Sequence, residues 1–138
     1  MVYISSSESE TEEIAYKLAQ SAPNEPSRLY SLQGSLGAGK TVFARGFARG
    51  LGYTGRVTSP TFCIVNEYIG GRLIMYHFDA YRVDSAGMLD IGFDDYLFAS
   101  NSVCLIEWAE NIANLIPENA VKIKLDIIGD KRRVSISY

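Results

Sequence analysis

Apolar residues recur along this chain with two spacings, one typical of β-strands and one typical of α-helices. Short apolar or alternating runs of strand length predict strands at 2–4, 28–33, 62–68, 73–79, 103–106, 121–128 and 133–138. Apolar positions three and four residues apart predict helices at about 9–19 and 42–51, a helix-like segment at 107–115, and one short helix near 88–89 in an otherwise polar stretch. Strands and helices mixed in this way are typical of an α/β domain, a mixed β-sheet flanked by helices.

Turn and cap residues mark several ends of these elements. The glycine-containing pairs at 70–71 and 129–130 each separate two strand-like runs and predict hairpins. Ser9 with Glu12 fits a capping box at the start of the first helix, and Gly52 fits the end of the second. The order of the elements is therefore predicted together with several of their boundaries.

The composition narrows the class of protein. Of 138 residues, 47% are hydrophobic and 21% are charged, which are ordinary proportions for one globular domain spanning 1–138. No apolar run approaches the roughly 20 residues that cross a bilayer, and the N-terminus lacks the basic region and apolar core of a signal peptide. We therefore expect a cytoplasmic protein without membrane contact, in which Cys63 and Cys104 are reduced thiols of the core.

The charges are unevenly distributed along the chain. The net charge of −3 argues against a surface that binds polyanions all over. Residues 26–56 nevertheless contain five basic residues and no acid. Arg45 and Arg49 are four residues apart and so share one face of the predicted helix. This face is either a docking surface for an acidic partner or RNA, or an ordinary solvated helix face.

The strongest motif is an unbroken G-x-x-x-x-G-K-T phosphate-binding loop, or P-loop, formed by Gly34, Ser35, Leu36, Gly37, Ala38, Gly39, Lys40 and Thr41. A strand is predicted before it and a helix after it, the arrangement in which a helix N-terminus faces an anion. The loop N–H groups surround a polyphosphate, Lys40 reaches the β- and γ-phosphates, and the Thr41 hydroxyl ligates Mg²⁺. We therefore predict a P-loop NTPase-like domain that binds a nucleoside triphosphate; the alternative is a glycine-rich turn with an incidental lysine.

Two carboxylates are placed to serve this loop. Asp79 ends one predicted apolar strand and Glu107 directly follows another, and ligands of open α/β sheets bind beyond such strand ends. One carboxylate would complete the Mg²⁺ shell while the other orients or deprotonates the attacking water, and the residues do not decide which does which. The alternative for each is a capping or turn acid. His77 lies on the same strand face as Asp79, and we interpret it as a hydrogen-bonded structural group.

Two other classes of function are compatible with a phosphate loop. A small-molecule kinase would need an acceptor pocket and an arginine-rich lid, but the candidate lid at 82–96 is rich in aspartate and contains one arginine. A nucleotide-gated binding module without significant turnover would use the same residues as a slow ATPase. Release of γ-phosphate with and without candidate acceptors separates the kinase from the ATPase.

Four motifs in order, at 36–41, 59–62, 77–82 and 107–110, resemble the TsaE (YjeE) family, small bacterial P-loop ATPases needed for threonylcarbamoyladenosine formation in tRNA. The resemblance covers nearly the whole chain, with Cys63 at a position that is usually polar and a short C-terminus. It implies slow ATP hydrolysis with Mg²⁺ in support of TsaD and TsaB, which transfer threonylcarbamoyl from its adenylate to the adenosine beside the anticodon. The tRNA would then be reached indirectly, through that complex.

The resemblance also implies roles for single residues. The expected ATP-binding residues are Thr11, Gly34, Gly37, Ala38, Gly39, Lys40 and Thr41. Thr41 and Glu107 would ligate Mg²⁺, and Asp79 and Glu107 would serve hydrolysis. The residues expected to act as a switch or to meet a partner are Ser59, Thr61, Trp108, Arg45 and Arg49.

Overall fold

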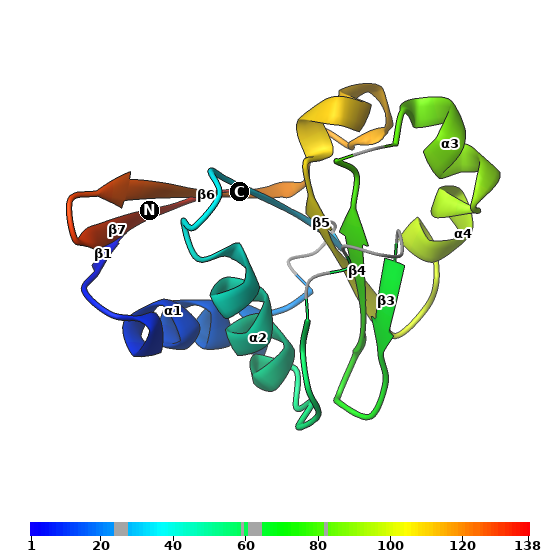
Figure 1. Cartoon of the computed structure of the whole chain (residues 1–138). Helices are drawn as coiled ribbons and strands as arrows, with labels where there is room; N and C mark the ends of the chain where they lie inside the picture. Colours follow the sequence, from blue (N-terminus) through cyan, green and yellow to red (C-terminus); the bar gives the residue numbers. More distant parts are fainter. Residues whose placement is uncertain (24–27, 59, 61–64, 82) are drawn as a thin grey trace.

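The structure is a computed structural model of the chain, and it describes residues 1–23, 28–58, 60, 65–81 and 83–138. Its centre is one seven-stranded sheet (Figure 1). In spatial order the strands are β1 (Val2–Ser5), β7 (Lys131–Ser137), β6 (Val121–Ile128), β2 (Leu29–Gly34), β5 (Ser102–Glu107), β4 (Ile74–Asp79) and β3 (Val65–Tyr68). The four central strands are parallel and both edges are antiparallel, so the predicted mixed sheet flanked by helices is confirmed.

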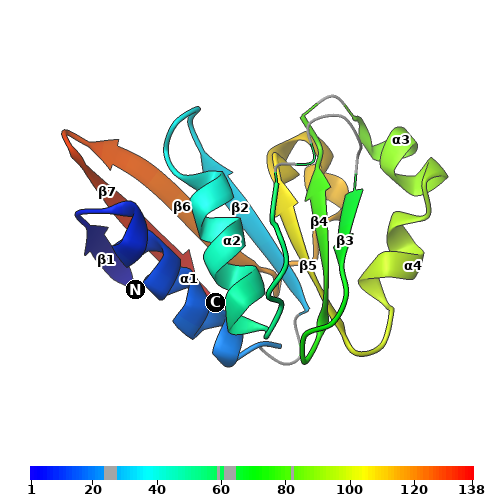
Figure 2. The same cartoon turned by 60° about the horizontal axis from the view of Figure 1, so that its bottom comes forward.

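Helices cover different parts of the two faces of this sheet. The long helices are α1 (Glu8–Gln20) and α2 (Lys40–Gly50), and the shorter ones are α3 (Ser85–Asp90), α4 (Phe93–Leu97) and the 3₁₀-helix η1 (Ala109–Leu115). Figures 1 and 2 show α1 and α2 together against one side of the sheet, while α3 and α4 lie beyond β3. The helices therefore create two separate apolar cores.

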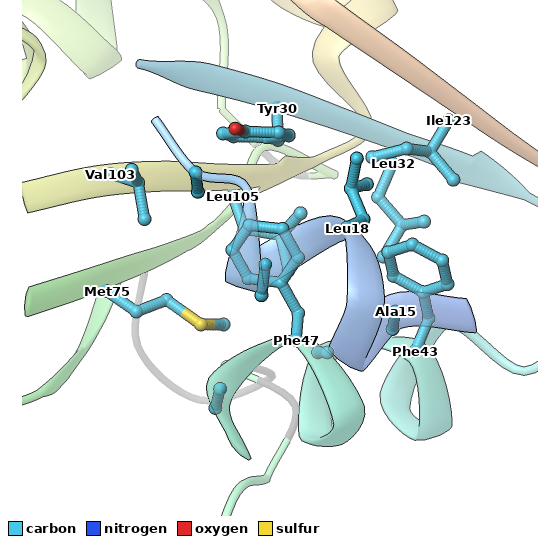
Figure 3. Close-up of a cluster of buried hydrophobic side chains, with 14 of the residues drawn as sticks. Ala15, Leu18, Tyr30, Leu32, Phe43, Phe47, Met75, Val103, Leu105 and Ile123 are labelled. Carbon is cyan, nitrogen blue, oxygen red and sulfur yellow. The ribbon is translucent and has the colours of Figure 1, made fainter. Parts of the chain in front are cut away.

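Strand β5 shows why there are two cores. All six of its residues are buried, and alternate side chains enter opposite cores. Val103 and Leu105 pack with the residues of α1 and α2 (Figure 3), whereas Cys104 and Ile106 pack with α3, α4 and η1. A strand covered on both faces reads as a continuous apolar run, and this explains why the sequence shows no alternation here.

Close packing of α2 on α1 depends on two glycines. A Cβ atom added at Gly46 would lie 2.4 Å from the carbonyl oxygen of Glu12, and one added at Gly50 would lie 2.4 Å from the carbonyl oxygen of Tyr16. Real Cβ atoms do not approach backbone atoms so closely. The two helices therefore touch backbone to backbone along one turn, and α2, which begins at the P-loop, is held firmly in place.

Most predicted elements are confirmed, and two differences have clear causes. The capping box at Ser9 was wrong by two residues: Ser7 caps α1 by accepting a hydrogen bond from the Glu10 N–H at 3.1 Å. The repetitive serine–glutamate segment fits the pattern in both registers, and Glu12 instead contacts α2. The polar stretch after β4 forms two short helices, because their few apolar residues face the second core. Finally, the predicted start of β3 at 62–64 lies outside the described residues.

The helix–helix contact yields a first prediction. Gly46→Ala should lower the free energy of unfolding by about 1–3 kcal/mol, because the new methyl group must push α1 away. The better helix propensity of alanine, about 1 kcal/mol, only partly offsets this cost. Urea unfolding measures the change, with the exposed α1 substitution Glu13→Ala as a control that should have little effect. A Gly46→Ala protein as stable as the parent would contradict the close packing.

Cys104 yields a second prediction. It is buried, its thiol donates to the Tyr96 carbonyl oxygen at 3.7 Å, and burial raises its pKa to about 12. At pH 8 the thiol therefore stays protonated, and the thiolate is the reactive species. In a Cys63→Ser background, alkylation of the native protein at pH 8 should be far slower than alkylation in urea. Equal rates would show that this core opens freely.

Candidate functional site

The P-loop joins β2 to α2 with an open inner side. Gly37 and Gly39 have φ angles of 82° and 104°, in the left-handed region that favours glycine. At both positions an added Cβ atom would meet nothing within 4 Å, so the space beside the loop is free. Helix α2 begins at Lys40, so the last two residues of the loop form its first turn, and its first N–H groups lack intrahelical partners. The loop therefore has the shape and polarity of an anion-binding site.

One contact within the loop and one from strand β7 hold the loop in this shape. Ala38 is fully buried, and its N–H donates to the Ser35 carbonyl oxygen at 3.0 Å. Arg132, on β7, donates from Nη2 to the Gly37 carbonyl oxygen at 3.3 Å. Nothing in the sequence indicated this arginine, because it reaches the loop only through the pairing of β6 with β7.

The two predicted carboxylates lie side by side. Asp79 and Glu107 are Cα partners in the parallel ladder of β4 with β5, and Glu107 is also the partner of Leu32 on β2. Both acids therefore stand at the edge of the sheet where β2 runs into the P-loop. Asp79 is half-buried and its Oδ1 accepts the Tyr81 N–H at 3.0 Å, whereas Glu107 is only 4% exposed. Parallel register thus brings together two acids that are 28 residues apart in sequence.

His77 accompanies these acids on the same face of β4. Its Nε2 lies 2.7 Å from Oε2 of Glu107, and both side chains are buried. The interpretation of His77 as a hydrogen-bonded group is thus confirmed, and its partner is the candidate metal ligand itself.

Trp108 connects the carboxylate edge to the P-loop. The Lys40 Nζ atom lies 4.6 Å from the centroid of the Trp108 ring, a cation–π geometry. Trp108 has a φ of 61°, an uncommon angle for a bulky residue, and its ring also contacts Tyr81 with centroids 4.9 Å apart. The backbone turn after Glu107 therefore aims the indole at the lysine. Sequence reasoning reached Trp108 only through the family resemblance, and it missed Tyr81.

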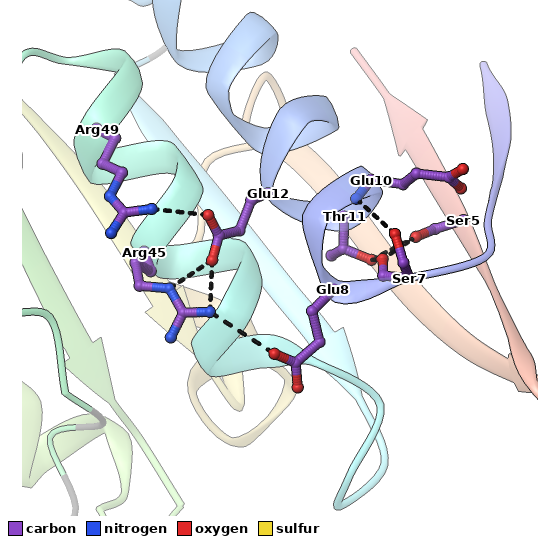
Figure 4. A network of polar contacts seen from close by, with 8 residues as sticks. All are labelled: Ser5, Ser7, Glu8, Glu10, Thr11, Glu12, Arg45 and Arg49. Atoms are coloured by element: carbon purple, nitrogen blue, oxygen red, sulfur yellow. Dashed lines mark hydrogen bonds and ion pairs between the residues drawn. The ribbon is translucent and has the colours of Figure 1, made fainter.

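Thr11 lies near the loop in a polar network (Figure 4). Its hydroxyl is 2.7 Å from the Ser5 hydroxyl oxygen and donates to the Ser7 carbonyl oxygen at 3.3 Å. A cavity of about 200 Å³ opens here, lined by Ser5, Ser6, Ser7, Glu8, Thr11, Gly37, Ala38, Gly39, Val42, Asp130 and Arg132. This cavity brings Thr11 together with the loop glycines, and it is large enough for part of a small ligand.

Arg45 and Arg49 share one face of α2 as predicted, but α1 occupies that face. Figure 4 shows Glu12 between them. Arg45 Nε donates to Glu12 Oε1 at 2.6 Å, and Arg49 Nη1 donates to Glu12 Oε2 at 2.8 Å. Glu8 adds a longer contact to Arg45 at 3.9 Å. These arginines therefore clamp α2 to α1, and their positive charge is partly neutralised within the chain.

The expected switch residues, Ser59 and Thr61, lie outside the described residues.

Within the described ranges, no three His, Cys, Asp or Glu side chains gather to hold a metal ion by themselves. The oxygens that fit Mg²⁺ are the exposed Thr41 hydroxyl and the Glu107 carboxylate, and phosphates and water commonly supply the other ligands of this ion. The described helices include none that is long and apolar enough to cross a membrane.

Comparison with known proteins gives concordant matches. A family model described as "Threonylcarbamoyl adenosine biosynthesis protein TsaE" matches residues 5–134. The tRNA threonylcarbamoyladenosine biosynthesis protein TsaE of Bacillus subtilis (strain 168) is 44% identical over 124 residues, which are 90% of this chain and 76% of that protein. The protein of the same name from Treponema pallidum (strain Nichols) is 45% identical over 103 residues, 74% of this chain and 75% of that protein. The crystal structure of YdiB from Bacillus subtilis has a TM-score of 0.84 and 36% identity, covering 99% of this chain and 83% of that one. The chain therefore belongs to the TsaE family.

Proposed function

We propose that this chain binds ATP with Mg²⁺, hydrolyses it slowly, and supports a TsaD–TsaB complex that forms N6-threonylcarbamoyladenosine in tRNA. One observation carries the ATPase part: an open P-loop stands at the same sheet edge as two carboxylates in register, Asp79 and Glu107. The relatives, which are tRNA threonylcarbamoyladenosine biosynthesis proteins, support the tRNA part.

The P-loop residues would bind the triphosphate. Backbone N–H groups at 37–41 surround the phosphates, and the helix N-terminus adds its partial positive charge. The Lys40 ammonium contacts the Trp108 ring, and it would exchange this contact for one with a phosphate. A cation–π contact is worth about 0.5–2 kcal/mol, less than the two or more charge-assisted contacts that a triphosphate offers.

The two carboxylates would have different roles, one in metal binding and one in orienting water. Thr41 and Glu107 would hold Mg²⁺, which neutralises charge on the β- and γ-phosphates when it is bound. Asp79 has one oxygen engaged by the Tyr81 N–H, and its other oxygen, Oδ2, would accept a hydrogen bond from the attacking water and orient it. The greater exposure of Asp79 suits contact with water, and the burial of Glu107 suits a fixed ligand.

The fold gives the kinase alternative no support. The candidate lid at 82–96 contains one basic residue, Arg82, and its described part packs into the second core through Met88 and Phe93. That core lies on the opposite face of the sheet from α2, so this segment is not a lid over the loop. A nucleotide-gated module with negligible turnover uses the same site, and measured turnover separates it from an ATPase.

The surface charge of this chain bears on its contacts with tRNA and with a protein partner. The net charge of −3 favours an indirect approach to tRNA through the TsaD–TsaB pair, in the cytoplasm. Arg45 and Arg49 are ion-paired with Glu12, so a partner would meet a mixed-charge surface there. A partner that senses the nucleotide would bind differently to the ATP and ADP forms, by thermodynamic linkage.

Lys40→Ala tests the phosphate contact. The variant loses a charge-assisted interaction worth about 1.5–3 kcal/mol, so affinity for ATP with Mg²⁺ should fall roughly ten-fold or more. Calorimetric titration measures it. Lys17→Ala, which removes an exposed lysine from α1, is the matched control and should bind normally. Unchanged affinity in Lys40→Ala would overturn the P-loop assignment.

Asp79→Asn and Glu107→Gln separate binding from chemistry. Asp79→Asn should keep most ATP affinity and lose most turnover, because the amide is a poorer acceptor for the attacking water. Glu107→Gln should weaken the dependence of ATP binding and turnover on Mg²⁺, because the amide is a poorer ligand for this ion. Phosphate release and binding assays report both, with Glu67→Gln on β3 as an exposed control. Wild-type turnover in Asp79→Asn would reduce this residue to a turn acid.

A further inference from the structure

A buried polar pair lies beneath the edge of the sheet where the P-loop and the two carboxylates meet. Among the described residues, the buried polar or charged ones are Ser5, Thr11, His77, Ser102 and Glu107. His77 is 0% exposed, and its Nε2 contacts Oε2 of Glu107 at 2.7 Å. Its other ring nitrogen, Nδ1, is buried and has no hydrogen-bond partner among the residues that the structure describes. A polar side chain in this position needs a reason, because burial of an unpaired nitrogen costs free energy.

Strand geometry aligns this pair with the site. His77 is the Cα partner of Leu105 on β5, and Asp79 is the partner of Glu107. His77 is therefore one pleat below the carboxylate pair, on the face that it shares with Met75 and α2. From there its ring reaches diagonally up to Glu107. Below the ring lie Met75 and the apolar side chains of α2, together with the rings of Tyr30 and Tyr68.

Within the described part of the chain Nδ1 has no partner, so the ring makes its one hydrogen bond through Nε2, to Glu107. The Nδ1–H tautomer would leave an N–H group buried without an acceptor among the described residues. The Nε2–H tautomer leaves only a bare lone pair at Nδ1, and it donates its one hydrogen to Glu107. The ring is therefore a fixed donor to the carboxylate.

We propose that His77 is a positioning residue for the metal-ligand carboxylate of Glu107, an inference that rests on the proposed function. The hydrogen bond engages Oε2, and within the described part of the chain no hydrogen bond or ion pair is recorded for Oε1. One oxygen is thus anchored in the core while the other stays available at the edge beside β2. Because the hydrogen bond already holds the Glu107 side chain in one conformation, Mg²⁺ binding costs less side-chain conformational entropy. Partners of this kind typically change metal affinity by about 10–100-fold.

The alternative is that His77 only satisfies a buried glutamate and stabilises the fold. Both roles predict a loss of stability on substitution, so unfolding alone does not separate them. They differ in the gain in nucleotide affinity that Mg²⁺ provides. A positioning role makes this gain depend on a donor at the Nε2 position, whereas a purely structural role leaves the gain intact in any variant that still folds.

The test measures binding of a non-hydrolysable ATP analogue by calorimetry, once with Mg²⁺ and once with EDTA, so that turnover plays no part. His77→Phe keeps the ring volume and removes the donor. His77→Gln places an amide N–H near the former Nε2, and His77→Asn is too short to reach Glu107. We expect the Mg²⁺-dependent gain to fall about ten-fold in His77→Phe and His77→Asn and to be largely restored in His77→Gln. Affinity in EDTA should stay unchanged in all three, because the P-loop is intact.

Glu107→Gln completes a double-mutant cycle with His77→Phe. It separates the positioning role of His77 from the proposed function. The double variant with His77→Phe should lose no more of the gain than Glu107→Gln alone, because the histidine acts through the glutamate. A full gain in His77→Phe, alongside a lost gain in Glu107→Gln, overturns the positioning role and leaves the proposed function standing. A full gain in Glu107→Gln overturns the metal role and the positioning role together. If His77→Phe does not fold, equal gains in His77→Asn and His77→Gln overturn the inference.

Discussion

Parallel pairing of β2, β5 and β4 is the constraint on which the site depends. In a parallel sheet all strands end at the same edge, so whatever follows them is brought together. Here the ladder makes Leu32, Glu107 and Asp79 neighbours across three strands, and the P-loop begins two residues after Leu32. Parallel strands need long crossover connections, and α2 makes the first of them. The same pairing that builds the core therefore fixes the distance between the phosphate loop and its carboxylates.

Two buried or half-buried polar contacts then keep these elements in place. Glu12 joins α1 to α2 by binding Arg45 and Arg49, next to glycines that allow backbone contact. His77 joins β4 to Glu107 at the base of the site. Such contacts stabilise modestly in net terms, because desolvation offsets much of the attraction. They are specific in direction, however, and each one sets the orientation of an element or side chain next to the P-loop.

Much of the fold and half of the site were accessible from local sequence. The P-loop at 34–41 is contiguous, and its chemistry follows from residues that are neighbours in the chain. Asp79 and Glu107 were found because each marks the end of an apolar strand, which is also a local signal. The helices α3 and α4 were not resolved as a pair, since each is too short to show helical periodicity. Their existence depends on the second core.

What the sequence determined by itself was the type and order of the elements and the presence of a phosphate-binding loop, because spacing and turn residues act over a few positions. Only the tertiary structure decided which polar groups meet. Ser9 and Glu12 fit a local cap, yet Glu12 contacts Arg45 across a helix interface that no local pattern encodes. His77 and Glu107 are 30 residues apart, and strand register alone brings them within hydrogen-bonding distance. Pairing between distant segments is a property of the packed chain, and the finer geometry of the site is set there.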